Sequence, residues 1–176
     1  MPRHLLVWLM AGLLASPLAA PVSADVVDAT AGSFTVQVSV VINTDAAHVY
    51  DALTRDVGRW WDSSHTYSGA AANLSIQATP GGCFCERLPQ GGVEHMVVIY
   101  ADRGKLLRMR GGLGPLQAMP VTGVWTLTLA ESGGRTTLVS TYSVSGNTKP
   151  ALNELAAAVD RVMTEQVTHL KQFAER

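Results

Sequence analysis

Charge is scarce in this chain of 176 residues: 15% of the residues are charged and the formal net charge is −1. Disordered chains combine low hydrophobicity with a charge excess, whereas 47% of these residues are hydrophobic, so we predict a folded protein. The absence of a basic excess argues against nucleic acid or an anionic membrane surface as a partner. The length fits one domain of about 100–200 residues rather than two.

Familiar catalytic motifs are also missing. The sequence has no Gly-x-Ser-x-Gly nucleophile elbow, no phosphate-binding glycine loop and no His-Glu-x-x-His helix. Hydrolase, nucleotide-dependent and zinc-protease functions therefore lose their usual support, and we predict no cofactor. Cysteine occurs only twice, and a chain of this length needs no disulfide framework to build its core.

The sequence begins with one cation, Arg3, followed by an apolar run from Leu5 to Leu14 and then by small residues up to Ala24. This order is typical of a secretory signal peptide. The run supplies about half of the roughly 20 apolar residues that a membrane span needs. We therefore predict a cleaved signal peptide over residues 1–24 and a periplasmic or secreted protein. The remaining chain, with 12 basic and 14 acidic residues, has no predicted membrane span.

After the signal peptide, residues 25–32 are small and polar, which we interpret as a flexible lead-in. Apolar and polar residues then alternate from Phe34 to Val40, a pattern that predicts a half-buried strand. Two short helices are expected next, the first from Ala46 to about Thr54. Residues 62–73 are rich in serine, glycine, alanine and asparagine, which predicts a loop.

Turn residues recur at intervals of about 8–12 residues between Leu74 and Val144, which predicts an antiparallel meander. One connection, from Gly111 to Pro120, is longer and rich in glycine. Apolar residues then recur by three and four from Pro150 to Ala174, as in an amphipathic helix of about 25 residues. The predicted fold class is α+β, with a curved antiparallel sheet of about seven strands wrapped around a long C-terminal helix.

The turn positions also predict which side chains face inward. A hairpin centred on Gln90 and Gly91 would pair Glu86 with His95 across two strands, and Arg87 with Glu94. Side-chain alternation then predicts one inner face, mostly apolar and aromatic, which suits a small-molecule pocket. The predicted inner-face residues are Phe84, Glu86, Leu88, Val93, His95, Val97, Ile99, Leu107, Met109, Trp125, Leu127, Leu129, Leu138, Ser140 and Tyr142.

The order of these elements resembles the START-like helix-grip superfamily, also called the SRPBCC or polyketide cyclase/dehydrase and lipid-transport superfamily. The resemblance rests on residues 49–54, Trp60-Trp61, 81–86, 111–116 and 134–138. It implies a single helix-grip domain over residues 33–176. Members of this superfamily include lipid and hormone carriers, cyclases, aromatases and co-chaperone-like activators, so the resemblance leaves the activity open.

Our leading hypothesis is an exported binding protein, monomeric or weakly dimeric, that holds a hydrophobic small molecule or lipid between sheet and final helix. The loops at 62–73 and 111–120 would gate access. The expected cavity residues are Trp60, Trp61, Phe84, Glu86, His95, Val97, Met109, Trp125, Ser140, Tyr142, Leu155 and Met163. One alternative is an enzyme of the cyclase or dehydratase type, with Glu86 and His95 as acid and base. Another is a protein-interaction domain with a filled core.

Two pairs of residues have competing interpretations. Glu86 and His95 form a structural hydrogen-bonded pair in the favoured interpretation; orienting a ligand and transferring a proton are the alternatives. Cys83 and Cys85 are most simply surface cysteines. In a regular strand their Cα atoms would lie about 6.6 Å apart, so a disulfide would require a bulge. A soft-metal site that includes Met96 is a weaker candidate. His48, His65 and His169 receive no role.

Overall fold

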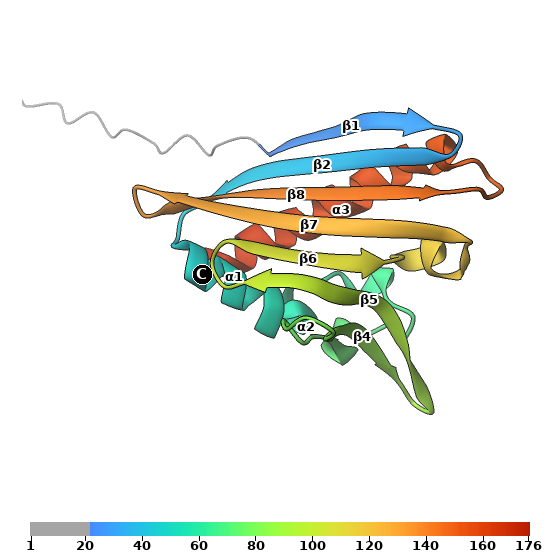
Figure 1. The fold of residues 1–176 in the computed structure, drawn as a ribbon. Coiled ribbons are helices and arrows are strands. Elements are labelled where there is room, and N and C mark those ends of the chain that lie inside the picture. Colours follow the sequence, from blue (N-terminus) through green and yellow to red (C-terminus); the bar gives the residue numbers. More distant parts are fainter. Residues whose placement is uncertain (1–21) are drawn as a thin grey trace, which may run out of the picture.

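The protein is described by a computed structural model over residues 22–176. Its centre is an eight-stranded antiparallel sheet with the order β1-β2-β8-β7-β6-β5-β4-β3 (Figure 1). The strands are β1 (Ser23–Thr30), β2 (Ser33–Ile42), β3 (Leu74–Ile76), β4 (Cys83–Leu88), β5 (Gly91–Asp102), β6 (Leu106–Gly111), β7 (Val121–Ser132) and β8 (Arg135–Gly146). The helices are α1 (Ala46–Arg55), α2 (Val57–Trp60) and α3 (Leu152–Ala174), with short 3₁₀ turns at η1 (Ser63–His65), η2 (Ala71–Asn73) and η3 (Gly114–Ala118).

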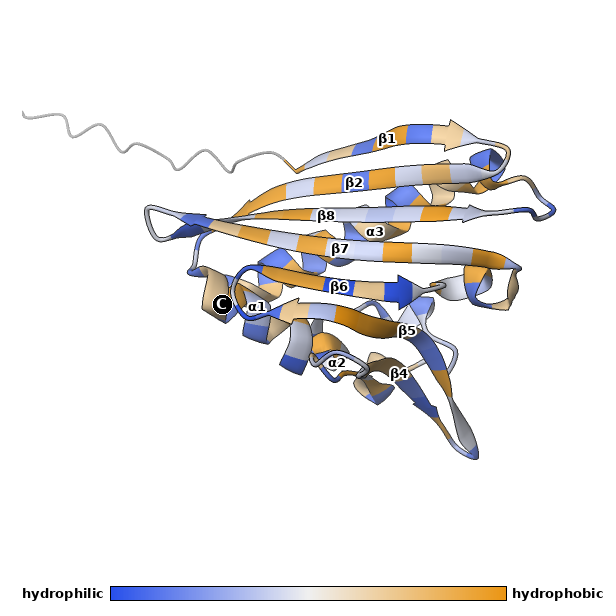
Figure 2. Ribbon diagram, in the orientation of Figure 1, coloured by the Kyte–Doolittle hydropathy of each residue, from blue (hydrophilic) through white to orange (hydrophobic). Residues whose placement is uncertain are grey.

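Alternating hydropathy along the central strands places one face of the sheet in the core. Along β2, Phe34, Val36 and Val38 are buried while the residues between them are half-buried or exposed, as the sequence pattern predicts. Figure 2 shows the same alternation of apolar and polar segments along β2 and β7. Trp125 of β7 lies opposite Tyr142 of β8, so these two residues share one face of the sheet as predicted.

Helix α3 packs along the sheet beside β1 and β2 (Figure 1). Its first residue, Leu152, donates a backbone hydrogen bond to Ala31 (3.0 Å), and near its end Lys171 donates to the carbonyl of Val41 (2.6 Å). Helices α1 and α2 contact the C-terminal part of the fold, where α1 meets α3, β7 and β8. The predicted α+β helix-grip fold is confirmed, with eight strands in place of about seven.

The interpretation of residues 25–32 as a flexible lead-in is wrong, because most of this segment forms β1. The strand pairs antiparallel with β2, placing Ala24 opposite Val38 and Asp25 opposite Gln37. It is an edge strand exposed along nearly its whole length, so its sequence lacks the apolar alternation of a half-buried strand. The predicted signal peptide lies outside the described residues except for its last three residues, 22–24, of which two open β1.

The predicted pairing of β4 with β5 is also wrong. Glu86 lies opposite Val93 and Arg87 lies opposite Gly92. The turn lies one residue earlier than predicted, on Pro89 and Gln90, because Leu88 pairs with Gly91. A β-bulge follows beyond Cys85: Phe84 pairs with Met96 and Cys85 pairs with Glu94, which leaves His95 as the extra residue of β5.

The bulge reverses the predicted facing of the next residues of β5. Met96 and Val98 are buried, whereas Val97 is half-buried and Ile99 is 42% exposed. A second bulge at Ile99 restores the phase, so Leu107 and Met109 of β6 are buried as predicted.

Cys83 and Cys85 form a disulfide. The interpretations of these residues as surface thiols or as metal ligands are therefore wrong. Their Cα atoms lie 5.3 Å apart, closer than the spacing of about 6.6 Å in a regular strand, and the irregularity of the β4–β5 pairing falls between Phe84 and Cys85. Over residues 22–176, no helix is both long and apolar enough to cross a membrane.

Candidate ligand groove

A groove of about 440 Å³ opens between the N-terminal half of α3 and the loops that follow α2 and β6. This volume lies within the range of about 300–1,000 Å³ that is typical of small-molecule sites. The residues lining the groove are Trp61, Ser64, His65, Thr66, Tyr67, Leu113, Gly114, Pro115, Leu116, Tyr142, Leu155, Ala158, Val159, Val162 and Met163. Both loops predicted to gate access therefore contribute walls.

The groove forms where the two loops, together with Tyr142 of β8, face the N-terminal half of α3. Leu155, Val159 and Val162 recur at helical spacing and point one apolar stripe at these loops. Gly114 adopts φ +53°, a left-handed conformation that glycine allows at low cost, and it lets the second loop turn over the groove. Further along α3, Val167 and Leu170 are fully buried.

Two tyrosine hydroxyls supply polar atoms at the groove. Tyr142 Oη accepts the backbone N–H of Leu113 (3.2 Å), and burial raises the pKa of Tyr142 to about 12. This hydroxyl is therefore neutral at physiological pH. Tyr67 Oη donates to the carbonyl of Gly114 (2.9 Å), which joins the two loops across the groove.

Beneath Tyr67 lies the buried pair of Glu86 and His95. Glu86 Oε2 accepts the N–H of Tyr67 (3.0 Å) and lies 3.1 Å from His95 Nε2, while the N–H of Ser68 donates to Glu86 Oε1. The ring of Tyr67 stacks on His95 with 5.9 Å between centroids. One carboxylate therefore ties the loop of residues 62–73 to the sheet.

The charges of this pair follow from its contacts. Burial disfavours the charged form of Glu86, but hydrogen bonds from Ser68, Tyr67 and His95 outweigh it and lower the pKa of Glu86. Burial also lowers the pKa of His95, against the opposing effect of Glu86. Glu86 is thus ionised and His95 neutral near pH 7. We assign the proton of His95 to Nε2, because the carboxylate can only accept a hydrogen bond.

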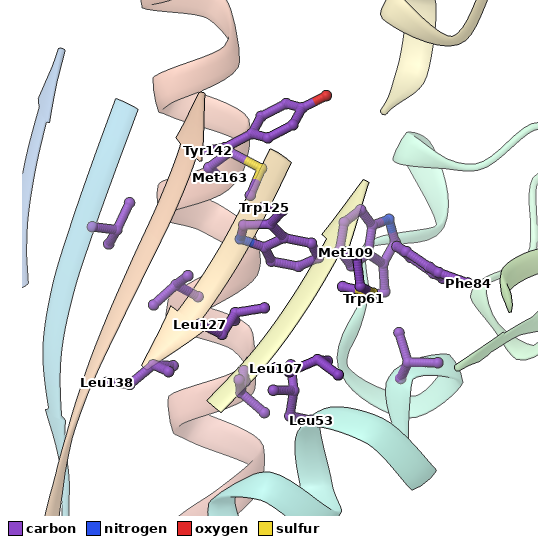
Figure 3. Packing of buried hydrophobic residues seen from close by; sticks show 14 of the residues in the cluster. Leu53, Trp61, Phe84, Leu107, Met109, Trp125, Leu127, Leu138, Tyr142 and Met163 are labelled. Atoms are coloured by element: carbon purple, nitrogen blue, oxygen red, sulfur yellow. The ribbon is translucent and has the colours of Figure 1, made fainter. Parts of the chain in front are cut away.

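The structure brings four of the predicted cavity residues to the groove: Trp61, Tyr142, Leu155 and Met163. Glu86 and His95 are not among its lining residues. Trp60, Phe84, Met109 and Trp125 are buried in the core, and Ser140 accepts a hydrogen bond from Trp125 Nε1 (2.8 Å). Figure 3 shows Trp61 beside Phe84, with Trp125 and Met109 next to them and Tyr142 directed away from this cluster. Val97 lies on the opposite face of the sheet from Met96 and Val98.

Sequence reasoning missed the lining residues of the two loops as individual ligand contacts, although it singled out both loops. It also omitted Val159 and Val162 from the cavity, although their helical periodicity was clear. The signal that could have found them was the length of the apolar stripe on the predicted final helix, which exceeds what the other predicted elements can cover. A helix of 23 residues presents more apolar surface than the short α1 and α2 can cover.

The sequence matches the family model described as polyketide cyclase/dehydrase and lipid transport over residues 33–175. The chain belongs to this family. No curated protein matches the chain.

Solved structures share the fold at low sequence identity. An uncharacterised protein from Rhizobium leguminosarum superposes with a TM-score of 0.63 at 18% identity, covering 89% of this chain and 99% of that one. The protein MLL2253 from Mesorhizobium loti gives 0.60 at 18% identity, with coverages of 81% and 97%. A protein of the dynemicin biosynthetic locus gives 0.55 at 21% identity, with coverages of 80% and 47%. These likenesses establish the helix-grip fold.

Proposed function

We propose that the protein is an exported binding protein that holds a hydrophobic small molecule or lipid in the groove beside α3. The observation that carries this proposal is the groove itself, whose walls are mostly aliphatic and aromatic side chains. An apolar ligand tail would pack on Leu155, Val159 and Val162. The hydroxyl of Tyr67 lines the groove on an exposed side chain and donates to Gly114, so it can still accept a hydrogen bond from a polar group of the ligand.

The geometry does not favour the enzyme alternative. A general acid or base must come within hydrogen-bond reach of a reacting group, and Glu86 is 1% exposed with its oxygens already bonded to Tyr67, Ser68 and His95. The open groove argues against a domain with a filled core.

Export is supported by two features that are independent of the groove. The apolar run that follows Arg3 has the order of a signal peptide. The disulfide between Cys83 and Cys85 is a feature of proteins in oxidising compartments such as the periplasm or the extracellular space. Determining the N-terminal residue of the protein recovered from the export compartment tests this part of the proposal. An intact N-terminus at Met1 would contradict it.

The first test of binding is native mass spectrometry of the protein purified from its host, followed by solvent extraction. We expect a bound species of a few hundred daltons that extraction removes. A clean apo mass, with no uptake from a panel of lipids and polyketides, would contradict the binding proposal.

A matched pair of substitutions then locates the ligand. Ala158 and its neighbour Ala157 are both exposed, but only Ala158 lines the groove, so Ala158→Phe fills the groove and Ala157→Phe is the control. We expect Ala158→Phe to weaken binding of a dansyl-labelled fatty acid by at least about tenfold, a cost of about 1.4 kcal/mol. Ala157→Phe should bind like the original protein. Equal affinities in both variants would place the ligand elsewhere.

A further inference from the structure

A second polar site lies where the loop of residues 62–73 meets α3, beside the groove. Asp62, Glu165 and His169 each place one ligand atom within 4.8 Å of the others. His65 Nε2 lies 3.2 Å from Glu165 Oε2. The loop and the helix thus contribute one carboxylate and one imidazole each.

From this arrangement we infer a binding site for a divalent transition metal ion of the zinc type, with Asp62, His65, Glu165 and His169 as ligands. Zinc binds histidine nitrogen at about 2.0–2.1 Å and carboxylate oxygen at about 2.0–2.2 Å, in tetrahedral sets. Calcium and magnesium prefer sites made of oxygen alone, so two imidazoles select against them.

The distances suit a site that closes on the ion. In a tetrahedral site with bonds of about 2.1 Å, ligand atoms lie about 3.4 Å apart. His65 and Glu165 are already at that separation, and their side chains are 33% and 40% exposed, so they have room to change rotamer. Residues 165 and 169 are four apart on α3 and therefore share one helix face.

The backbone on the loop side is already held in place. The N–H of Asp62 donates to Oε1 of the buried Gln166 (2.8 Å), and Asp62 Oδ1 accepts the N–H of Ser64 (2.7 Å). The carbonyl of His65 accepts the indole N–H of Trp61 (3.1 Å). Metal-binding residues are commonly fixed by such outer contacts.

A bound ion would join the loop to α3 at one wall of the groove, because His65 is itself a lining residue. The metal site does not depend on the proposed carrier function, since the four ligands are defined without reference to any groove ligand. Its test therefore uses tag-free protein stripped of metal by a chelator and of lipid by solvent extraction.

Calorimetric titration with Zn²⁺ is the primary measurement. We expect one ion per chain with a dissociation constant below about 10 µM. Glu165→Gln preserves the side-chain shape, and both it and His169→Ala should weaken binding at least about tenfold. His48→Ala is the control, because His48 is an exposed histidine on α1 outside the site. With zinc in hundredfold excess over its dissociation constant, the melting temperature should rise by about 5–10 °C in the original protein and in the control.

The imidazole signals in an NMR spectrum give a readout that does not depend on affinity. The ring resonances of His65 and His169 should shift on addition of one equivalent of Zn²⁺, while those of His48 stay in place. The absence of saturable binding of one ion per chain would overturn the proposal. So would equal affinities in the original protein, Glu165→Gln and His169→Ala.

Discussion

The two halves of α3 carry similar apolar stripes but meet different surroundings. In the C-terminal half, Val167 and Leu170 are buried, and Lys171 donates a hydrogen bond to the carbonyl of Val41 near the end of β2. In the N-terminal half, Leu155, Val159 and Val162 are only partly buried and face the groove. The difference shows that the helix does not create the cavity by its own sequence. What covers the stripe decides whether a core or a groove results.

The largest expected effect comes from the same substitution made in each half of α3. Leu170→Ala removes a side chain that is 1% exposed and should lower the free energy of unfolding by about 3 kcal/mol. Leu155→Ala acts on a groove wall that already lacks packing partners and should cost less than about 1.5 kcal/mol. Urea denaturation measures both. Equal losses would mean that the N-terminal half is as tightly packed as the C-terminal half.

The next effect concerns the carboxylate that holds the loop of residues 62–73 to the sheet. Glu86→Gln removes the charge that accepts hydrogen bonds from Tyr67 and Ser68, and should cost about 2 kcal/mol. The amides of these two residues should also exchange their hydrogens faster. Glu94→Gln, at an exposed position of β5, is the control and should change neither quantity. Unchanged exchange in Glu86→Gln would mean that the loop does not depend on this anchor.

Reduction of the disulfide should have a smaller effect, confined to stability. Cys83 and Cys85 are two residues apart, so the bond closes a very short loop and its loss should cost about 1.5 kcal/mol in the chain-entropy account. Neither cysteine lines the groove, so affinity for the dansyl-labelled fatty acid should stay the same. The double variant with serine at both positions should not respond to reductant. A loss of affinity on reduction would instead link β4 to the groove.

The smallest effect is a dependence of stability on pH that arises at the buried pair. The pKa of His95 is lowered in the folded protein, so below pH of about 6.5 the unfolded chain takes up the proton first and stability falls. The pKa of Glu86 is also lowered, which adds a further loss below pH of about 4.3. Each group contributes a slope of at most about 1.4 kcal/mol per pH unit.

His95→Gln separates these two contributions. It should abolish the decline that begins near pH 6.5, the ordinary pKa of histidine, and leave the decline at lower pH. Denaturation curves from pH 7 to 4 measure both. An unchanged decline near pH 6.5 in this variant would assign it to another group.

Much of the fold could be predicted because its long elements have strong periodicity. The strand from Phe34, the hairpin that pairs Trp125 with Tyr142, and α3 all follow from the spacing of apolar residues. The edge strand β1 could not be predicted in this way. It buries little surface and is held by backbone hydrogen bonds, which depend weakly on side-chain identity.

The polar sites were harder to predict for a different reason. The bulge at His95 adds one residue to β5, and no glycine or proline marks its position in the sequence. Counting alternate residues from the turn therefore placed the side chains that follow His95 on the wrong face of the sheet. Glu86 and His95 nevertheless meet, since both residues precede the point at which the phase reverses. The neighbours Asp62 and Glu165 are about a hundred residues apart in sequence, and only the position of the loop against α3 brings them together.

The strand order has a consequence for how the molecule is completed. The N-terminal hairpin of β1 and β2 has β8, the last strand of the chain, as its inner neighbour, and it is covered by α3, the last helix. While the polypeptide is being made, this hairpin lacks its inner neighbour until β8, which begins about a hundred residues after β2, has been added. Native assembly therefore joins two segments that lie far apart in the sequence, and a polypeptide that ends before Arg135 lacks the strand that pairs with β2.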